Sequence, residues 1–156
     1  MMKILTLPNS LVLVFILVFL TSQPVRADMM KSIPLLTQSL GVTESQAKGG
    51  TGVIFDHVKQ KVSAEDFAQV AKALSGVDSL VDLAPKASDL SRQIGGLSPA
   101  LGGKSDLTGG MAGVAQRFGK LGLDAGMVDK YVKMILDFAQ SEAGTAVTNI
   151  IKSSLV

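Results

Sequence analysis

A signal that ends one helix and starts the next occurs twice in this sequence. The first copy is Leu40-Gly41-Val42-Thr43 and the second is Leu121-Gly122-Leu123-Asp124. In each copy a glycine can take the left-handed conformation that closes a helix, and Thr or Asp offers a side-chain oxygen that caps the next helix. Apolar residues at helical spacing follow both signals, whereas the alternating pattern of strands is nearly absent. The pattern predicts an all-α protein.

Further signals divide the chain into about six short helices. Gln46 lies three residues after Thr43 and predicts a capping box. Gly76 and Gly144 are expected to end or break two more helices. The expected helices cover residues 32–40, 43–61, 63–75, 111–121, 124–143 and 145–155, with a possible short one at 77–84.

The N-terminus predicts export. Lys3 precedes an apolar run from Leu11 to Leu20, and helix-breaking residues and Val25-Arg26-Ala27 follow it. Small side chains at Val25 and Ala27 suit a signal peptidase, so residues 1–27 are expected to be a signal peptide cut between Ala27 and Asp28. The alternative is a retained anchor, but a spanning helix needs about 20 apolar residues. The expected location is the periplasm or the medium.

Charge and cysteine content exclude two classes of protein. The precursor has 15 Lys and Arg against 13 Asp and Glu, but the leader contains Lys3, Arg26 and no acid. The mature part is therefore neutral, without the positive surface of a nucleic-acid-binding protein. It has no cysteine, so disulfides do not stabilise it, and this suits a bacterial envelope protein.

The two helix-ending signals belong to stretches that align without a gap at an offset of about 81 residues. Ile54 then falls on Ile135, and Leu74 falls on Leu155. We therefore expect two related units, an N-terminal one at 28–93 and a C-terminal one at 114–156. The alternative is a chance alignment, since short apolar stripes match easily.

A glycine-rich segment at 94–113 joins these units. Gly-Gly pairs recur in it every seven residues, and apolar side chains lie between them. One interpretation is a flexible linker, because glycine is costly to order. The other is close packing in self-association or membrane contact, which makes this segment the candidate interaction site. Its candidate residues are Gly95, Gly96, Leu97, Leu101, Gly102, Gly103, Gly109 and Gly110.

Catalytic and metal chemistry have little support in the sequence. His57 is the single histidine, and it lacks the second histidine, cysteine or nucleophile motif that a metal or acyl-transfer site needs. We expect an exposed or boundary helix histidine, no cofactor and no enzyme activity. Gly49-Gly50-Thr51-Gly52 is expected inside a helix, where missing side chains let another helix approach closely.

Several motifs in their order resemble a known family. They include the run from Leu40 to Gly50, Ser63-Ala64-Glu65-Asp66-Phe67, Gly76-Val77-Asp78-Ser79-Leu80 and the run from Phe118 to Val128. Together they resemble the VcgC/VcgE-like proteins, small exported bacterial proteins of unknown function. The resemblance covers roughly residues 33–155. It implies a mostly helical envelope protein and offers no catalytic residue.

Two functions remain open at this point. The first is a non-enzymatic interaction or structural module of the cell envelope, which binds an envelope protein or another copy of itself. Contact with a membrane surface is possible after cleavage, and nucleic acid is not an expected partner. The second is a carrier of a small apolar ligand, with Met111, Met127 and Met134 facing inward.

Overall fold

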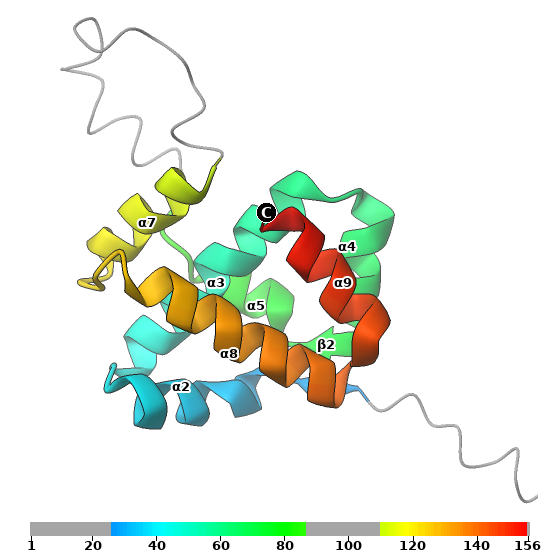
Figure 1. Cartoon of the computed structure of the whole chain (residues 1–156), viewed down its shortest axis with the longest axis horizontal. Helices are drawn as coiled ribbons and strands as arrows, with labels where there is room; N and C mark the ends of the chain where they lie inside the picture. Colours follow the sequence, from blue (N-terminus) through cyan, green and yellow to red (C-terminus); the bar gives the residue numbers. More distant parts are fainter. Residues whose placement is uncertain (1–25, 87–109, 156) are drawn as a thin grey trace, which may run out of the picture.

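The computed structural model describes residues 26–86 and 110–155, and in these residues the protein is all-α, as predicted (Figure 1). The N-terminal stretch contains β1 (Ala27–Asp28), a 3₁₀ helix η1 (Met29–Lys31), α2 (Ser32–Leu40), α3 (Glu44–Lys61), α4 (Ala64–Ala73), β2 (Leu74–Ser75) and α5 (Val77–Asp82). The C-terminal stretch contains α7 (Met111–Lys120), α8 (Met127–Glu142) and α9 (Gly144–Ser154).

The helix ends follow the local signals closely. Gly41, Gly76, Gly122 and Gly144 all have positive φ, at 65°, 88°, 73° and 82°. The predicted capping box at the start of α3 is confirmed. The Gln46 backbone N–H donates to the Thr43 hydroxyl at 3.2 Å, and the Thr43 N–H donates to Gln46 Oε1 at 3.0 Å.

One helix start differs from the prediction. The sequence predicts that Asp124 caps the helix directly, but α8 begins three residues later, at Met127. The Asp124 carboxylate instead accepts a hydrogen bond from the Gly126 N–H at 2.8 Å, which closes a turn ahead of the helix. A short Asp side chain bonds the backbone two residues on as readily as it caps a helix.

The helix α3 is the centre of the molecule. It packs against α2, α4 and α5 from its own stretch, and against α7, α8 and α9 from the C-terminal stretch. Figure 1 shows α8 lying across α3, with α2 along one side of it. Buried residues from both stretches form a single hydrophobic core. The largest fully buried side chains include Tyr131, Phe55, Phe118, Met29 and Leu36.

The two helix-ending signals meet at one end of α3. The Gln46 side chain, already part of the capping box, donates to the Leu121 carbonyl at 3.0 Å. The Tyr131 hydroxyl donates to the Gln46 carbonyl at 3.2 Å. Tyr131 also packs edge-on against Phe118, with ring centroids 5.1 Å apart. The two hydrogen bonds connect the N-terminal stretch to the C-terminal one, and the ring contact joins α7 to α8.

Corresponding helices also end at corresponding positions. Lys61 ends α3 and Glu142 ends α8, and Ala73 ends α4 and Ser154 ends α9, each pair 81 residues apart. This spacing agrees with the alignment of the two stretches. Their relatedness, and the division into units at 28–93 and 114–156, stay predictions.

A short strand pair is the element that the sequence pattern did not predict. Strand β1 pairs in parallel with β2, with Ala27 opposite Leu74 and Asp28 opposite Ser75. Ala27 and Leu74 are both buried, and Met29 follows directly into the core. The N-terminal end of the described chain is therefore built into the fold.

Candidate interaction surface

The glycine-rich candidate segment falls almost wholly outside the described residues. Gly95, Gly96, Leu97, Leu101, Gly102, Gly103 and Gly109 are not described, so their proposed role stays a prediction. Gly110 is described, and it is the N-cap of α7. Its carbonyl accepts hydrogen bonds from the N–H groups of Gly113 and Val114 at 2.9 and 3.2 Å. Gly110 therefore starts a helix.

The glycines in α3 pack as expected, against α5, α8 and the turn that follows α7. A Cβ at Gly49 would lie 2.8 Å from a Leu121 methyl carbon, and a Cβ at Gly50 would lie 2.6 Å from the Tyr131 ring. At Gly52 it would lie 1.9 Å from the Leu80 carbonyl oxygen, on the backbone of α5. The missing side chains therefore let α5 and the C-terminal stretch approach α3 closely.

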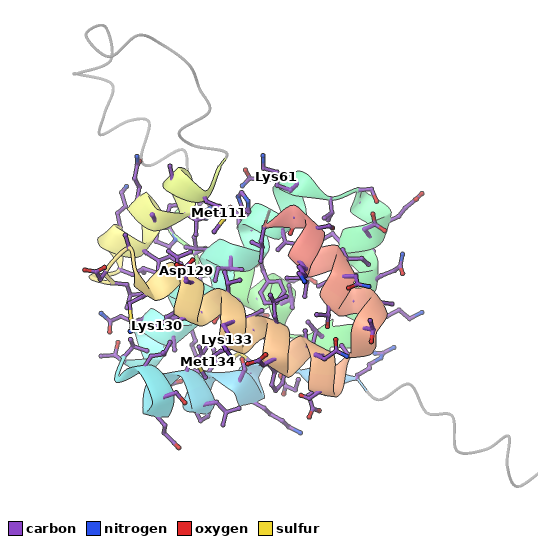
Figure 2. All side chains as sticks on the ribbon, in the orientation of Figure 1. Lys61, Met111, Asp129, Lys130, Lys133 and Met134 are labelled. Atoms are coloured by element: carbon purple, nitrogen blue, oxygen red, sulfur yellow. The ribbon has the colours of Figure 1, made fainter. Side chains whose placement is uncertain are left out.

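The prediction of an exposed or boundary histidine at position 57 is wrong. His57 is buried, and it lines a hollow of about 180 Å³ with Lys61 at the end of α3, Met111 of α7 and Ser154 of α9. Lys61 and Met111 lie at the same end of the molecule (Figure 2). The sequence could not show this, because the covering helix α9 comes about 90 residues later in the chain.

Desolvation is the main cause that lowers the pKa of His57 below its usual value of 6.5. The positive charges of Lys61 and Arg117 act in the same direction, whereas the Ser154 backbone and the Asp56 carboxylate act in the other. His57 is therefore held mainly as neutral imidazole near pH 7. A buried neutral histidine of this kind is most simply a core residue.

Sequence reasoning missed a partly buried ion pair beside His57. Arg117 Nη1 lies 2.7 Å from Asp56 Oδ2, and Arg117 Nε donates to the Pro85 carbonyl at 2.6 Å. Gln60 Nε2 donates to the same Asp56 oxygen at 2.8 Å. The available signal was that Arg117 lies between Val114 and Phe118 on the buried face of α7. The pair joins α7 to α3 and to the end of the N-terminal stretch.

An apolar groove lies between α2 and α8. It measures about 270 Å³ and is lined by Leu35, Met134, Phe138, Asp137 and Ser141. Leu35 is 50% exposed, although it is a large apolar side chain. Met134 comes from the side of α8 next to α2 (Figure 2). Asp137 forms an ion pair with Lys133 at 2.8 Å, so charge at this rim is balanced.

A second hollow, the α2–α3 pocket, lies on the other side of α2. It measures about 320 Å³ and is lined by Met30, Ile33, Pro34, Thr37, Glu44 and Lys48. Glu44 and Lys48 pair with each other along α3, and this pairing lowers the pKa of the exposed Glu44 carboxyl. The α2 helix is therefore flanked by the apolar groove on one side and by a hollow with mixed apolar and polar walls on the other.

The sequence matches the model of a known protein family over residues 20–156, which is more than half of the chain. That family is described as "Protein of unknown function VcgC/VcgE (DUF2780)". The chain belongs to this family. The match confirms the resemblance drawn from the ordered motifs, and it includes every helix and strand described above. No curated protein and no solved structure matches the chain.

The three methionines that suggested a carrier do not line a common cavity in this VcgC/VcgE protein. Met111 borders the hollow at His57, and Met134 borders the groove between α2 and α8. Met127 packs at the edge of the core. The expected pocket lined by Met111, Met127 and Met134 is therefore not formed by these residues as a set.

Residues 26–86 and 110–155 contain neither a cluster of metal ligands nor a helix that could span a membrane. No group of three or more His, Cys, Asp or Glu side chains there is placed to hold a metal ion. None of the helices within those ranges is long and apolar enough to cross a membrane.

Proposed function

We propose that this VcgC/VcgE protein is a non-enzymatic, exported interaction module of the cell envelope. In this proposal the groove between α2 and α8 receives an apolar helix of a partner protein. The main support for this proposal is the half-exposed Leu35, which lies beside Met134 and Phe138 in the groove. Exposed apolar side chains gathered in a groove mark a binding surface more specifically than single exposed leucines do.

The shape and charge of the groove favour a helix as the occupant. Two neighbouring helices form its walls, and an amphipathic helix can lay its apolar face into such a groove. The ion pair between Lys133 and Asp137 balances the charge at the rim, so no strongly charged partner is required. Export rests on the leader sequence, with its apolar run from Leu11 to Leu20.

The test compares two leucines of similar exposure. Leu35 is 50% exposed in the groove, and Leu83 is 57% exposed elsewhere, after α5. Tagged precursors carrying Leu35→Lys or Leu83→Lys are expressed in the native host, and captured proteins are quantified by mass spectrometry. Both variants should fold, because each side chain already faces solvent.

We expect Leu35→Lys to lose at least about 90% of a reproducible envelope partner, because a lysine charge in an apolar contact costs several kcal/mol. Leu83→Lys should retain that partner. Equal capture by both variants would contradict the groove as the binding surface. Loss of capture with Leu83→Lys alone would also contradict the groove, and would indicate that the partner binds near Leu83, at the C-terminal end of the N-terminal stretch.

A carrier of a small apolar ligand is the second candidate, and the α2–α3 pocket favours it. Its volume of about 320 Å³ lies within the usual range for ligand sites, and Met30, Ile33 and Pro34 supply apolar walls. Native mass spectrometry of freshly purified protein should then show an added mass. Thr37→Trp, which fills the pocket, should remove it. A clean protein mass in the unaltered chain would contradict the carrier function.

A further inference from the structure

The bond expected to be cut during export lies where the described chain enters the fold, between buried Ala27 and partly exposed Asp28. Ala27, on its N-terminal side, is only 3% exposed, and Met29, two residues beyond it, is fully buried. Arg26 is exposed and Ala27 is buried, so the chain passes from the surface into the core within one residue. A folded precursor therefore does not present this bond as an accessible loop.

The backbone on both sides of the bond is held by hydrogen bonds. Residues 27 and 28 form β1 and pair with β2. The Ser75 hydroxyl donates to the Ala27 carbonyl at 3.2 Å, and Ser75 itself lies on β2. On the other side, the Met30 N–H donates to the Asp28 carboxylate at 3.0 Å. The Ser32 hydroxyl donates to the Met29 carbonyl at 2.7 Å.

The turn after β2 fits closely around the same segment. Gly76 has a positive φ of 88°, and a Cβ there would lie 3.3 Å from the Met30 side chain and 3.5 Å from the Asp28 carboxylate. β2 and the residue that follows it therefore pack against this junction, in which Asp28 remains partly exposed.

We propose that cleavage after Ala27 occurs only while β1 is unpaired, so that processing precedes folding of this end of the protein. The inference rests on the proposed export of the precursor. A peptidase binds its substrate as an extended segment, and it needs the backbone groups and the Ala27 side chain that β2 and the core hold here. Proteolysis of a structured segment requires prior local opening.

Cleavage also changes the contacts at the N-terminus of the mature protein. Cleavage removes Ala27 and leaves Asp28 as the first residue, so the Ser75 hydroxyl loses its Ala27 acceptor. The Asp28 carboxylate and the buried Met29 remain, and they hold the new N-terminus against β2. The mature chain therefore keeps η1 and the anchoring methionine.

The experiment follows cleavage of the full-length precursor, purified in mild detergent, by a purified bacterial signal peptidase. Intact-mass measurement reports the release of residues 28–156. Leu74→Asp places a charge at a fully buried β2 position and disrupts folding there, while the leader and the junction keep their sequence. Ser75→Ala removes only the hydroxyl that holds Ala27, and Ser79→Ala, on the exposed face of α5, is its matched control.

We expect the folded precursor to resist cleavage and Leu74→Asp to be cut between Ala27 and Asp28 at least about tenfold faster, because cleavage follows the population of the open form. Ser75→Ala should be cut faster than Ser79→Ala. Equal rates for the folded precursor and Leu74→Asp would overturn the inference and leave export intact. Failure of Leu74→Asp to be cut at this bond would overturn both the inference and the processing site.

Discussion

Gly52 is the position in α3 where a single methyl group should matter most. Glycine inside a helix normally costs about 1 kcal/mol relative to alanine, so Gly→Ala is usually stabilising. At Gly52, however, the new Cβ would lie 1.9 Å from the Leu80 carbonyl oxygen. A backbone atom cannot move aside as a flexible side chain can. We therefore expect Gly52→Ala to lower the free energy of unfolding by about 1–3 kcal/mol.

Gly119 in α7 provides the matched control for this prediction. A Cβ added there meets no atom within 4 Å, and its φ is not positive. Gly119→Ala should raise the free energy of unfolding by about 0.5–1 kcal/mol. Urea denaturation followed by circular dichroism measures both variants. Stabilisation by Gly52→Ala would show that α5 does not pack on α3 at this distance.

His57 should make stability depend on pH. Its pKa is lowered in the fold, mainly by burial, so the unfolded chain binds a proton at higher pH than the folded chain does. The stabilising contribution of neutral His57 is complete above the unfolded pKa of 6.5. It is lost as the pH falls from there toward the lower folded pKa.

The variant His57→Gln removes this titration, and the chain has no other histidine. Thermal unfolding is measured between about pH 7.5 and 5.5, where carboxylates contribute less. The melting temperature of the unaltered protein should fall more steeply across this range than that of His57→Gln. Parallel curves would mean that His57 titrates in the fold as it does in the unfolded chain.

At the scale of elements, the ion pair between Asp56 and Arg117 fixes α7 against α3. The Arg117 side chain is 4% exposed and the Asp56 side chain 23% exposed. Asp56→Asn leaves a buried guanidinium without its counter-charge. We expect this change to cost about 3 kcal/mol, the lower end of the range for buried pairs, because water reaches Asp56.

The double variant Asp56→Asn/Arg117→Met should recover part of that loss, because it removes the buried charge as well. The exposed pair of Lys133 and Asp137 is the comparison, and Lys133→Ala should cost less than about 1 kcal/mol. Denaturant titration of all four proteins measures these differences. A double variant no more stable than Asp56→Asn alone would contradict this account of the pair.

The helices were predictable because their limits are set locally. Gly41 and Gly122 close helices through their own backbone conformation, and Thr43 and Gln46 form a capping box within four residues. The β1–β2 pair was not predictable in this way. Two residues carry no alternating pattern, and the pairing joins positions 27 and 74 through tertiary contacts.

The candidate site was less predictable than the helices, because most of it depends on tertiary contacts. The close packing at Gly49 to Gly52 could be foreseen, because glycine in a helix costs free energy that packing must offset. The burial of His57 and the partner of Arg117 depend on helices distant in sequence. The groove at Leu35 likewise arises only where α2 meets α8.

At the scale of the whole molecule, one core holds both stretches of the chain together. Residues from α2 to α5 and from α7 to α9 contribute to it. The packing of this core brings α2 beside α8, about 100 residues later in the sequence, and an apolar groove lies between the two helices. This juxtaposition is the basis of the proposed interaction function.

Site-specific photocrosslinking in living cells tests that function most directly. A photoreactive phenylalanine derivative replaces Leu35 in the groove, or Lys72 on the exposed side of α4 as the control. The account predicts a discrete crosslinked species of higher mass from position 35, identified as an envelope protein, and none from position 72. A product containing only a second copy of this chain would make the groove a self-association surface. No product from position 35, or the same products from both positions, would contradict the account.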